Sequence, residues 1–291
     1  MPDIQGSSQE SPFRVIAELD PPKGASLRAF LDFALQIRGR VDTIRVTDSE
    51  NAIMRMSPIA PCLTLSDIGF TPQMVINGRD RNRISFQADL LAAAALGVKE
   101  VVLKAGHDAA EGDQPLAKSS GDLDMPTMIK SATSLTRGKD LAGEDLDGPT
   151  TYEVGVSFEL SDDAGVNRQL AESFPAMADH GVRSVTLGPT YDLNILEMFV
   201  PAAQQNNIRL YTSIMFLKSV VMIRYLNNLP GVPSVPQEYL KKMMDAPVRK
   251  DAGMHIAAEL YRELEAMSDG SVLLAIGLGE RLPDFLTMIG R

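Results

Sequence analysis

The chain has 291 residues, 44% of them hydrophobic, and 28 lysines and arginines stand against 38 aspartates and glutamates. The net charge of −10 argues against a general affinity for nucleic acid or for anionic membranes. A single cysteine, Cys62, excludes an internal disulfide and a cysteine-based metal cluster. No apolar run approaches the ~20 residues of a membrane span, and the polar start does not resemble a signal peptide, so we expect a cytoplasmic protein.

Short apolar stretches alternate with amphipathic ones after a polar lead, residues 1–11, for which we expect disorder. The apolar stretches predict strands over 13–18, 42–47, 73–77, 100–104, 152–158, 183–187, 208–214 and 272–276. The stretches between them predict helices over 26–38, 80–96, 125–135, 165–180, 192–204, 216–229, 237–244, 248–267 and 283–289. Strict alternation implies a parallel sheet, and eight units predict one (β/α)₈ barrel domain over 12–291. A doubly wound sheet is the alternative, but no GxGxxG turn follows the first strand.

The first predicted strand ends in an unusual way, with Glu18 and then Pro21 and Pro22. Two prolines fix φ twice and remove two backbone donors, so the strand must stop and leave in a rigid direction. In a parallel barrel this is the carboxyl end, where such barrels keep their chemistry. Glu18 is therefore the leading catalytic candidate.

Polar residues also follow the other predicted strands. They are Thr47, Asp48, Asn77, Lys104, Gly106, His107, Asp108, Glu159, Thr190 and Ser213. Each has a structural alternative as a helix cap or a solvated loop residue. The histidines are scattered and no serine or cysteine occupies a nucleophile elbow, so we expect neither a metal site nor covalent catalysis.

Two further segments have a functional interpretation beside a structural one. Residues 79–83 place three arginines around a helix start, where Asp80 as helix cap is the favoured interpretation and an anion anchor the other. Residues 105–149 form a long connection of low apolar content, which is typical of a functional loop or of disorder.

The chain resembles the methylenetetrahydrofolate reductase family, whose catalytic domain is a (β/α)₈ barrel. The resemblance rests on the Glu-x-x-Pro-Pro element at 18–22, on Val46-Thr47, on Lys104 with 106–108, and on Thr186. Segments 231–236 and 252–257 look like the link and the penultimate helix of that family. The Glu-x-x-Pro-Pro element is the most specific of these matches.

The chain departs from the family pattern at several cofactor positions. Leu187 replaces a folate-contacting Gln, and Val75-Ile76-Asn77 replaces His-Leu-Thr. Residues 158–162 lack the aromatic and His positions that hold the flavin, and 275–279 replace Tyr-Thr-Leu-Asn-Arg, with Arg281 nearby. The acid is thus retained while much of the flavin cradle is not.

The resemblance implies hydride transfer to the carbon that bridges N5 and N10 of tetrahydrofolate, with NADH or NADPH as donor and FAD held by a non-standard set of contacts. Glu18 would protonate N10 and Asp108 would stabilise the cation that forms. The cofactor-binding residues implied are Thr47, Asp48, Asn77, Lys104, Gly106, His107 and Glu159, and the substrate-binding ones are Thr186, Thr190, Ser213 and Arg281. A homo-oligomer is expected, with a reductase complex as a further assembly. The alternatives are a flavin-free enzyme, a reductase for another pterin, and a reductase-like subunit without its own activity.

Overall fold

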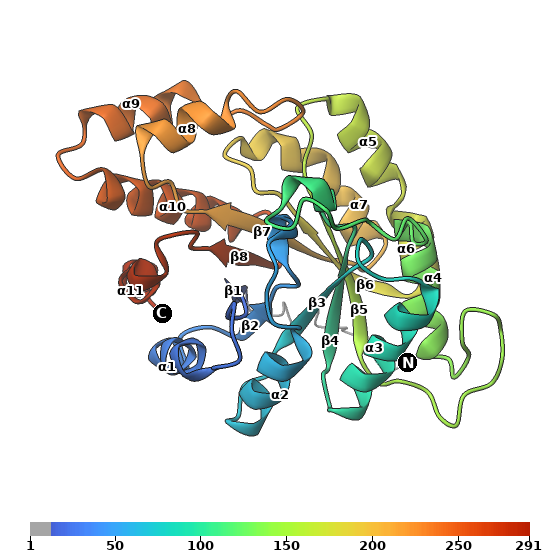
Figure 1. Ribbon diagram of the computed structural model, residues 1–291. Helices are drawn as coiled ribbons and strands as arrows, with labels where there is room; N and C mark the ends of the chain where they lie inside the picture. The colour runs from blue at the N-terminus through green and yellow to red at the C-terminus, as the bar shows by residue number, and fades with distance from the viewer. Residues whose placement is uncertain (1–12) are drawn as a thin grey trace, which may run out of the picture.

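The computed structural model describes residues 13–291, so the predicted disorder of 1–11 lies outside the described residues. Eight parallel strands close into one barrel in sequence order, with β1 paired to β8 (Figure 1). The strands are β1 (Arg14–Leu19), β2 (Thr43–Val46), β3 (Gln73–Asn77), β4 (Glu100–Lys104), β5 (Glu153–Phe158), β6 (Val182–Leu187), β7 (Arg209–Met215) and β8 (Gly270–Leu274). The predicted (β/α)₈ barrel is confirmed.

Helices surround the barrel and cover the outer faces of the strands (Figure 1). The α-helices are α1 (Arg28–Gln36), α2 (Ile59–Asp67), α3 (Arg83–Ala95), α4 (Met125–Leu135), α5 (Ala164–Glu172), α6 (Phe174–His180), α7 (Phe199–Gln205), α8 (Val220–Leu226), α9 (Gln237–Asp245), α10 (Arg249–Leu264) and α11 (Leu282–Met288). Short 3₁₀ turns are η1 (Glu50–Ala52), η2 (Ala109–Glu111), η3 (Leu193–Met198) and η4 (Gly279–Arg281). No helix of residues 13–291 is long and apolar enough to cross a membrane.

Helix boundaries differ from the predictions where local chemistry intervenes. The helix predicted over 165–180 is broken at Ser173, because Pro175 lies in the first turn of α6 and cannot continue a preceding helix. The stretch 192–204 begins as η3 and becomes α7 only at Phe199. Helix α8 starts four residues later than predicted, at Val220, where the Ser219 hydroxyl caps the N–H of Met222.

The structure corrects two predictions for the helices on either side of β3. Helix α2 was not predicted, because Pro58 and Pro61 suggested a loop; both prolines lie at its start, where an N–H has no intrahelical partner to lose. Helix α3 is capped by Asn82 and not by Asp80: Asn82 accepts from the N–H of Ser85, and Ser85 accepts in return.

Strand β8 begins two residues earlier than predicted. Its Gly270 pairs with Arg14 of β1 on one side and with Tyr211 of β7 on the other. A Cβ on Gly270 would lie 2.3 Å from the carbonyl oxygen of Arg14, so only glycine permits this close approach. Closure of the barrel therefore decides where the strand starts.

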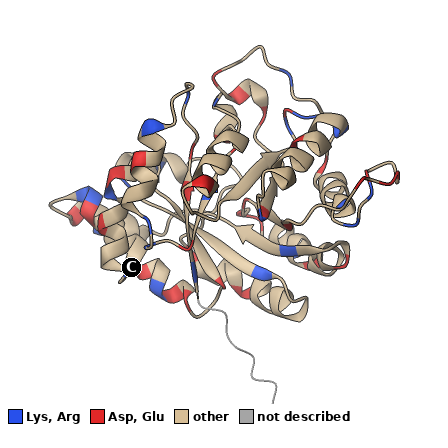
Figure 2. Cartoon of the chain, turned by 90° about the horizontal axis from the view of Figure 1, so that it is seen from below, with Lys and Arg blue, Asp and Glu red and all other residues tan. Residues whose placement is uncertain are grey.

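Acidic and basic residues are interspersed over the outer helices (Figure 2). The barrel interior is less usual, because one row of register partners is polar: Glu18 pairs with Arg45, Arg45 with Gln73, and Gln73 with Glu100. Barrels of this type normally fill their interior with bulky apolar residues.

Candidate active site at the carboxyl end of the barrel

Glu18 lies near the carboxyl end of β1, and its side chain keeps 17% of its surface exposed. Burial raises the pKa of the Glu18 carboxyl, although the charges of Lys104 and Arg45 lower it. The nearest cation is the Arg45 guanidinium, with Nη1 4.0 Å from Oε2 of Glu18, which is beyond hydrogen-bond distance. Among residues 13–291 no donor is hydrogen-bonded to this carboxyl, so its oxygens are free to meet a ligand.

A chain of ion pairs lies beside Glu18 and links three strand ends. The Lys104 ammonium, at the end of β4, donates to Oε1 of Glu50 at 2.5 Å. The His107 Nε2 lies 3.7 Å from the same oxygen and 3.1 Å from Oε1 of Glu159, just after β5. Two carboxylates and two cations therefore alternate across the mouth of the barrel.

The alternation determines the charge state of each member. The neighbouring carboxylates of Glu159 and Glu50 raise the pKa of His107 to about 10, so the imidazole is protonated at neutral pH. Burial opposes ionisation of Glu50, but His107 and Lys104 lower its pKa to about 2. The pKa of Glu159 is lowered by His107. Burial disfavours the charge of Lys104, but Glu50 raises its pKa above the usual value.

Glu50, His107 and Glu159 bring one ligand atom each within 4.8 Å of one another, a spacing that a transition-metal ion would accept. The same Glu50 oxygen already accepts a hydrogen bond from Lys104. The imidazolium supplies the positive charge between the two carboxylates. The cluster is thus satisfied as an ion-pair chain, and a metal would have to displace both Lys104 and the imidazole proton.

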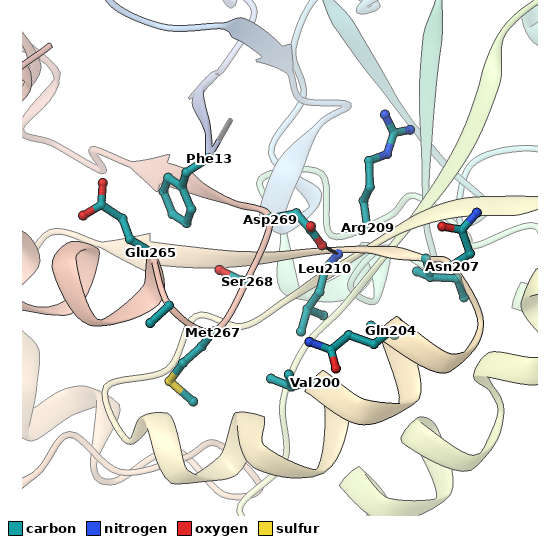
Figure 3. Close-up of a pocket in the computed structure, with 13 residues that line it drawn as sticks. Phe13, Val200, Gln204, Asn207, Arg209, Leu210, Glu265, Met267, Ser268 and Asp269 are labelled. Atoms are coloured by element: carbon teal, nitrogen blue, oxygen red, sulfur yellow. Dashed lines mark hydrogen bonds between the residues drawn. The ribbon is translucent and has the colours of Figure 1, made fainter. Parts of the chain in front are cut away.

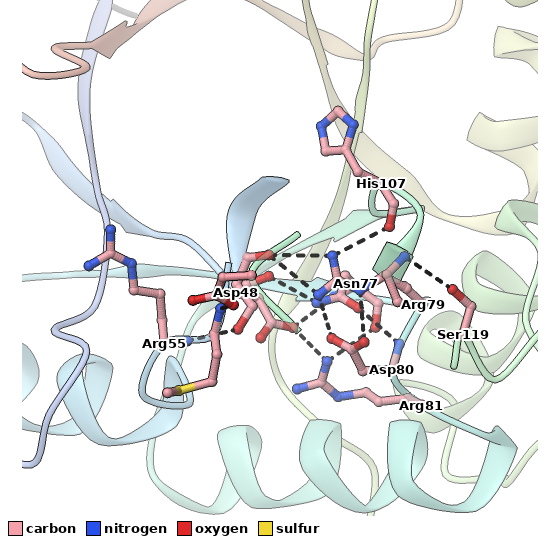
Figure 4. Close-up of polar contacts among 12 residues, drawn as sticks. Asp48, Arg55, Asn77, Arg79, Asp80, Arg81, His107 and Ser119 are labelled. Atoms are coloured by element: carbon pink, nitrogen blue, oxygen red, sulfur yellow. Dashed lines mark hydrogen bonds and ion pairs between the residues drawn. The ribbon is translucent and has the colours of Figure 1, made fainter. Parts of the chain in front are cut away.

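A second polar network makes the neighbouring rim rigid (Figure 4). Asp48, 7% exposed, accepts from the backbone N–H of Asn77 at 3.0 Å and from Nη1 of Arg81 at 2.5 Å. Burial raises the pKa of Asp48 although Arg81 acts in the opposite direction. Arg79 binds Asp80 and reaches the carbonyl oxygens of Ser49 and His107, at 3.3 Å and 3.4 Å respectively. These side chains hold the loops after β2, β3 and β4 together.

The loop that carries Glu50 has a strained backbone. Ser49, Asn51 and Ala52 have positive φ values of 47°, 54° and 56°. Non-glycine residues in this region cost about 1–3 kcal/mol each and persist where the surroundings hold them. Gly112 is such a contact, because a Cβ there would lie 1.9 Å from the carbonyl oxygen of Ala52.

The structure brings together most of the predicted cofactor-binding residues. Asp48, Asn77, Lys104, His107 and Glu159 lie in the two networks above. Gly106 has a φ of 85° and would place a Cβ 3.1 Å from Cβ of Arg79. Thr47 donates to Asp20 at 2.6 Å, which ties the end of β2 to the segment before the double proline.

The remaining predicted residues have other contacts. Asp108 accepts from the N–H of Ala110 and so caps η2, which leaves His107 as the member of that segment that meets the carboxylates. Thr190 is bonded to the backbone of Asp192, and Ser213 is buried on β7. Arg281 pairs with Asp251 at 2.7 Å and with Asp284 at 3.1 Å.

Thr186 is 1% exposed, and its hydroxyl accepts from Nη2 of Arg45 at 2.9 Å. Arg45 and Glu50 were not predicted as site residues. The signal for Arg45 was its place between Thr43 and Thr47 at alternate positions of one strand, which puts a charge on an inward face. Glu50 carried no local signal beyond its place after a strand end.

The cations that could bind a flavin diphosphate, Lys104 and the arginines of 79–83, are already paired. Lys104 pairs with Glu50, Arg79 with Asp80, and Arg83 with Asp122. A diphosphate would have to displace these carboxylates, so the residues do not form a ready flavin diphosphate site.

Two hollows differ in their relation to this chemistry. The space among Asp48, Glu50, Asn77, Lys104 and His107 is narrow, about 10 Å³. A larger hollow of about 740 Å³ lies before β7 and β8, where Phe13, Arg209 and Asp269 are among its lining residues (Figure 3). That is the amino end of the strands, where barrels keep stability and not chemistry. We therefore place the site at the carboxyl end.

No protein-family model matches the chain, and no curated protein matches it in sequence. Solved structures do match over nearly its whole length. An uncharacterised protein from Clostridium thermocellum that binds two copies of 5-methyl-5,6,7,8-tetrahydrofolic acid has a TM-score of 0.62 and 10% identity, over 96% of this chain and 97% of its own. The long-chain alkane monooxygenase LadA has a TM-score of 0.57 and 11% identity, with 96% and 91% covered. Tryptophan synthase from M. tuberculosis has 0.53 and 9%, with 96% and 92% covered. These identities show the shared barrel fold.

Proposed function

We propose that the chain binds a reduced folate at the carboxyl end of its barrel and interconverts 5,10-methylene- and 5-methyl-tetrahydrofolate by hydride transfer. The observation that carries the proposal is the Glu18 carboxyl, which is half-buried, accepts no hydrogen bond from residues 13–291 and has a raised pKa. The Glu-x-x-Pro-Pro element at 18–22, by which the chain resembles the reductase family, supports it. So does the neighbour from Clostridium thermocellum, which binds the product of this reaction.

The reaction needs an acid that is still protonated near neutral pH. The methylene bridge opens when N10 receives a proton, because the C–N10 bond then breaks and leaves an N5 iminium ion. NADH or NADPH, when bound, would supply the hydride that converts the iminium carbon into the N5-methyl group, and its nicotinamide would be oxidised. Glu18 gives its proton to N10 and recovers one from water, and burial favours the protonated form of its carboxyl.

The ion-pair chain beside Glu18 supplies the electrostatic setting for this step. Glu50 acts on Glu18 through space and is ionised at neutral pH because its own pKa is about 2. Fixed negative charge near a developing iminium cation lowers the barrier when it is oriented in advance. We assign this role to Glu50, in place of the Asp108 role implied by the family resemblance, because the Asp108 carboxylate caps η2.

Binding and turnover should be measured separately. Calorimetric titration of the purified protein with 5-methyl-tetrahydrofolate tests the site, and no binding would refute the proposal. Conversion of methylene- to methyl-tetrahydrofolate with NADH or NADPH tests the chemistry, with and without added FAD. Turnover in a colourless protein that ignores added FAD would establish direct hydride transfer. Folate binding without turnover would make the chain a reductase-like subunit.

A further inference from the structure

Arg45 is a buried charge that the proposed chemistry does not use. It is 1% exposed, on β2, and its register partners are Glu18 on one side and Gln73 on the other. Register partners in a sheet point to the same face, so the three side chains share the barrel interior. Since strands in a barrel are staggered, this row descends from the carboxyl end at Glu18 towards Glu100 at the start of β4.

Hydrogen bonds hold the Arg45 guanidinium on two sides. Its Nε donates to Oε1 of Gln73 at 2.9 Å, and its Nη2 donates to the hydroxyl of Thr186 at 2.9 Å. The Gln73 amide donates in turn to Oε2 of Glu100 at 2.7 Å. Glu100 is paired with Arg14, which also donates to Thr43 at 2.6 Å.

The network fixes direction as well as position. The Gln73 amide accepts from a cation and donates to an anion, so its orientation is determined by the charges at its two ends. With Nε and Nη2 engaged, Nη1 is left 4.0 Å from Oε2 of Glu18. That distance is too long to use a lone pair of the carboxyl and short enough for its charge to act.

Burying a guanidinium is costly unless its bonds are satisfied, so a barrel interior would ordinarily hold an apolar residue here. The neutral partners Gln73 and Thr186 each accept one hydrogen bond from Arg45 without neutralising it. Its positive charge is therefore available to Glu18, whose carboxyl lies 4.0 Å away.

We propose that Arg45 is the positioning residue for Glu18, held by Gln73 and Thr186 so that its charge orients the carboxyl and limits its proton affinity. The inference rests on the proposed role of Glu18 as acid. Without Arg45 the half-buried carboxyl would hold its proton more tightly and release it to N10 less readily. Other charges that act on Glu18 are Lys104 on β4, Glu50 on η1 and Asp20 after β1.

The first test loosens Arg45 without removing its charge. Thr186→Val keeps the shape of the side chain and deletes the acceptor of Nη2. The matched control is Thr212→Val on the adjacent strand β7, because Thr212 is also fully buried and its hydroxyl has no hydrogen-bond partner in the described part of the chain. We expect Thr186→Val to lower kcat about tenfold with KM within about twofold. Thr212→Val should match the wild type.

The second test reads the carboxyl directly and needs no substrate. Isotope-edited infrared spectroscopy, with Glu18→Gln as reference, gives the proton affinity of Glu18 in each variant. Arg45→Met should raise it at least about tenfold, since it removes the closest cation. Arg45→Lys should bring the proton affinity of Glu18 back close to the wild-type value but should not restore kcat, because a lysine cannot engage Gln73 and Thr186 together.

The titration separates this inference from the proposed function, because the effect of Arg45 on the proton affinity of Glu18 can be measured even if the chain reduces no folate. A Glu18 proton affinity in Arg45→Met within about threefold of the wild type would overturn it. Should Arg45→Met fail to fold, a Thr186→Val variant that titrates like Thr212→Val would overturn it equally.

Discussion

Replacing Glu18 with Gln tests the assignment of the acid most directly. The amide has nearly the shape of the carboxyl and no acidic proton, so the N10 proton transfer loses its donor. Positioned acids contribute about 10²–10⁴-fold to a rate, which is roughly 2.7–5.4 kcal/mol of transition-state free energy. We expect kcat to fall by that factor while the affinity for 5-methyl-tetrahydrofolate stays within about threefold, because the substitution removes no contact that binds the ligand equally in the ground state and the transition state.

The same substitution should not destabilise the protein. The pKa of Glu18 is raised in the folded state, so folding favours the protonated form. Ionised Glu18 therefore costs stability once the pH rises above its ordinary value of 4.5, at about 1.4 kcal/mol for each unit of pKa difference. The attraction of Arg45 and Lys104 is already contained in that net direction. A glutamine resembles the protonated form, and its advantage over the wild type should grow as pH rises.

Folate binding by calorimetry, turnover by NADH oxidation and unfolding in urea measure the three quantities. Glu172→Gln is a suitable control, since Glu172 is an exposed residue of α5. Near-normal turnover of Glu18→Gln would remove Glu18 from the role of acid. A Glu18→Gln protein that is less stable than the wild type at every pH would show that Glu18 is a structural partner of Arg45 and Lys104.

Three further predictions concern the mouth of the barrel. His107→Asn should destabilise the protein below pH 6.5, and this loss of stability should disappear as the pH rises through about 10, because the wild-type imidazolium loses its proton there. Urea unfolding across this range measures the difference, and a difference that is independent of pH would contradict the prediction. Gly112→Ala should lower the free energy of unfolding by about 1–3 kcal/mol and disturb the loop that carries Glu50, because the new Cβ would overlap the carbonyl oxygen of Ala52. Gly148→Ala is the control, because a Cβ at Gly148 meets only open space, and equal unfolding midpoints for the two variants would contradict the prediction. Hydrogen exchange of residues 105–124 should slow when 5-methyl-tetrahydrofolate binds, because the space beside His107 is too narrow for a folate unless this segment moves. Exchange of α4 should not change, and identical exchange of 105–124 with and without the ligand would make the segment a passive surface loop.

Much of the fold could be predicted because each unit is specified locally. Apolar runs of strand length, separated by amphipathic stretches, define β3 and β4 to the residue. Pro21 and Pro22 end the first strand near Glu18 whatever the rest of the chain does, because proline acts on its own backbone. Other boundaries are set by packing, as at β8, whose start depends on pairing with Arg14 of a strand far away in sequence.

Local sequence patterns are enough to show that strands and helices alternate along the chain and that a rigid carboxylate stands where the first strand ends. The surroundings of that carboxylate depend on the folded barrel. Glu18, Arg45, Gln73 and Glu100 come from four strands, and they form one row because the stagger of the closed barrel sets which residues are register partners. The charge state of His107 likewise depends on Glu50 and Glu159, which lie more than fifty residues away on either side. Register and long-range pairing are properties of the closed sheet, and no local pattern encodes them.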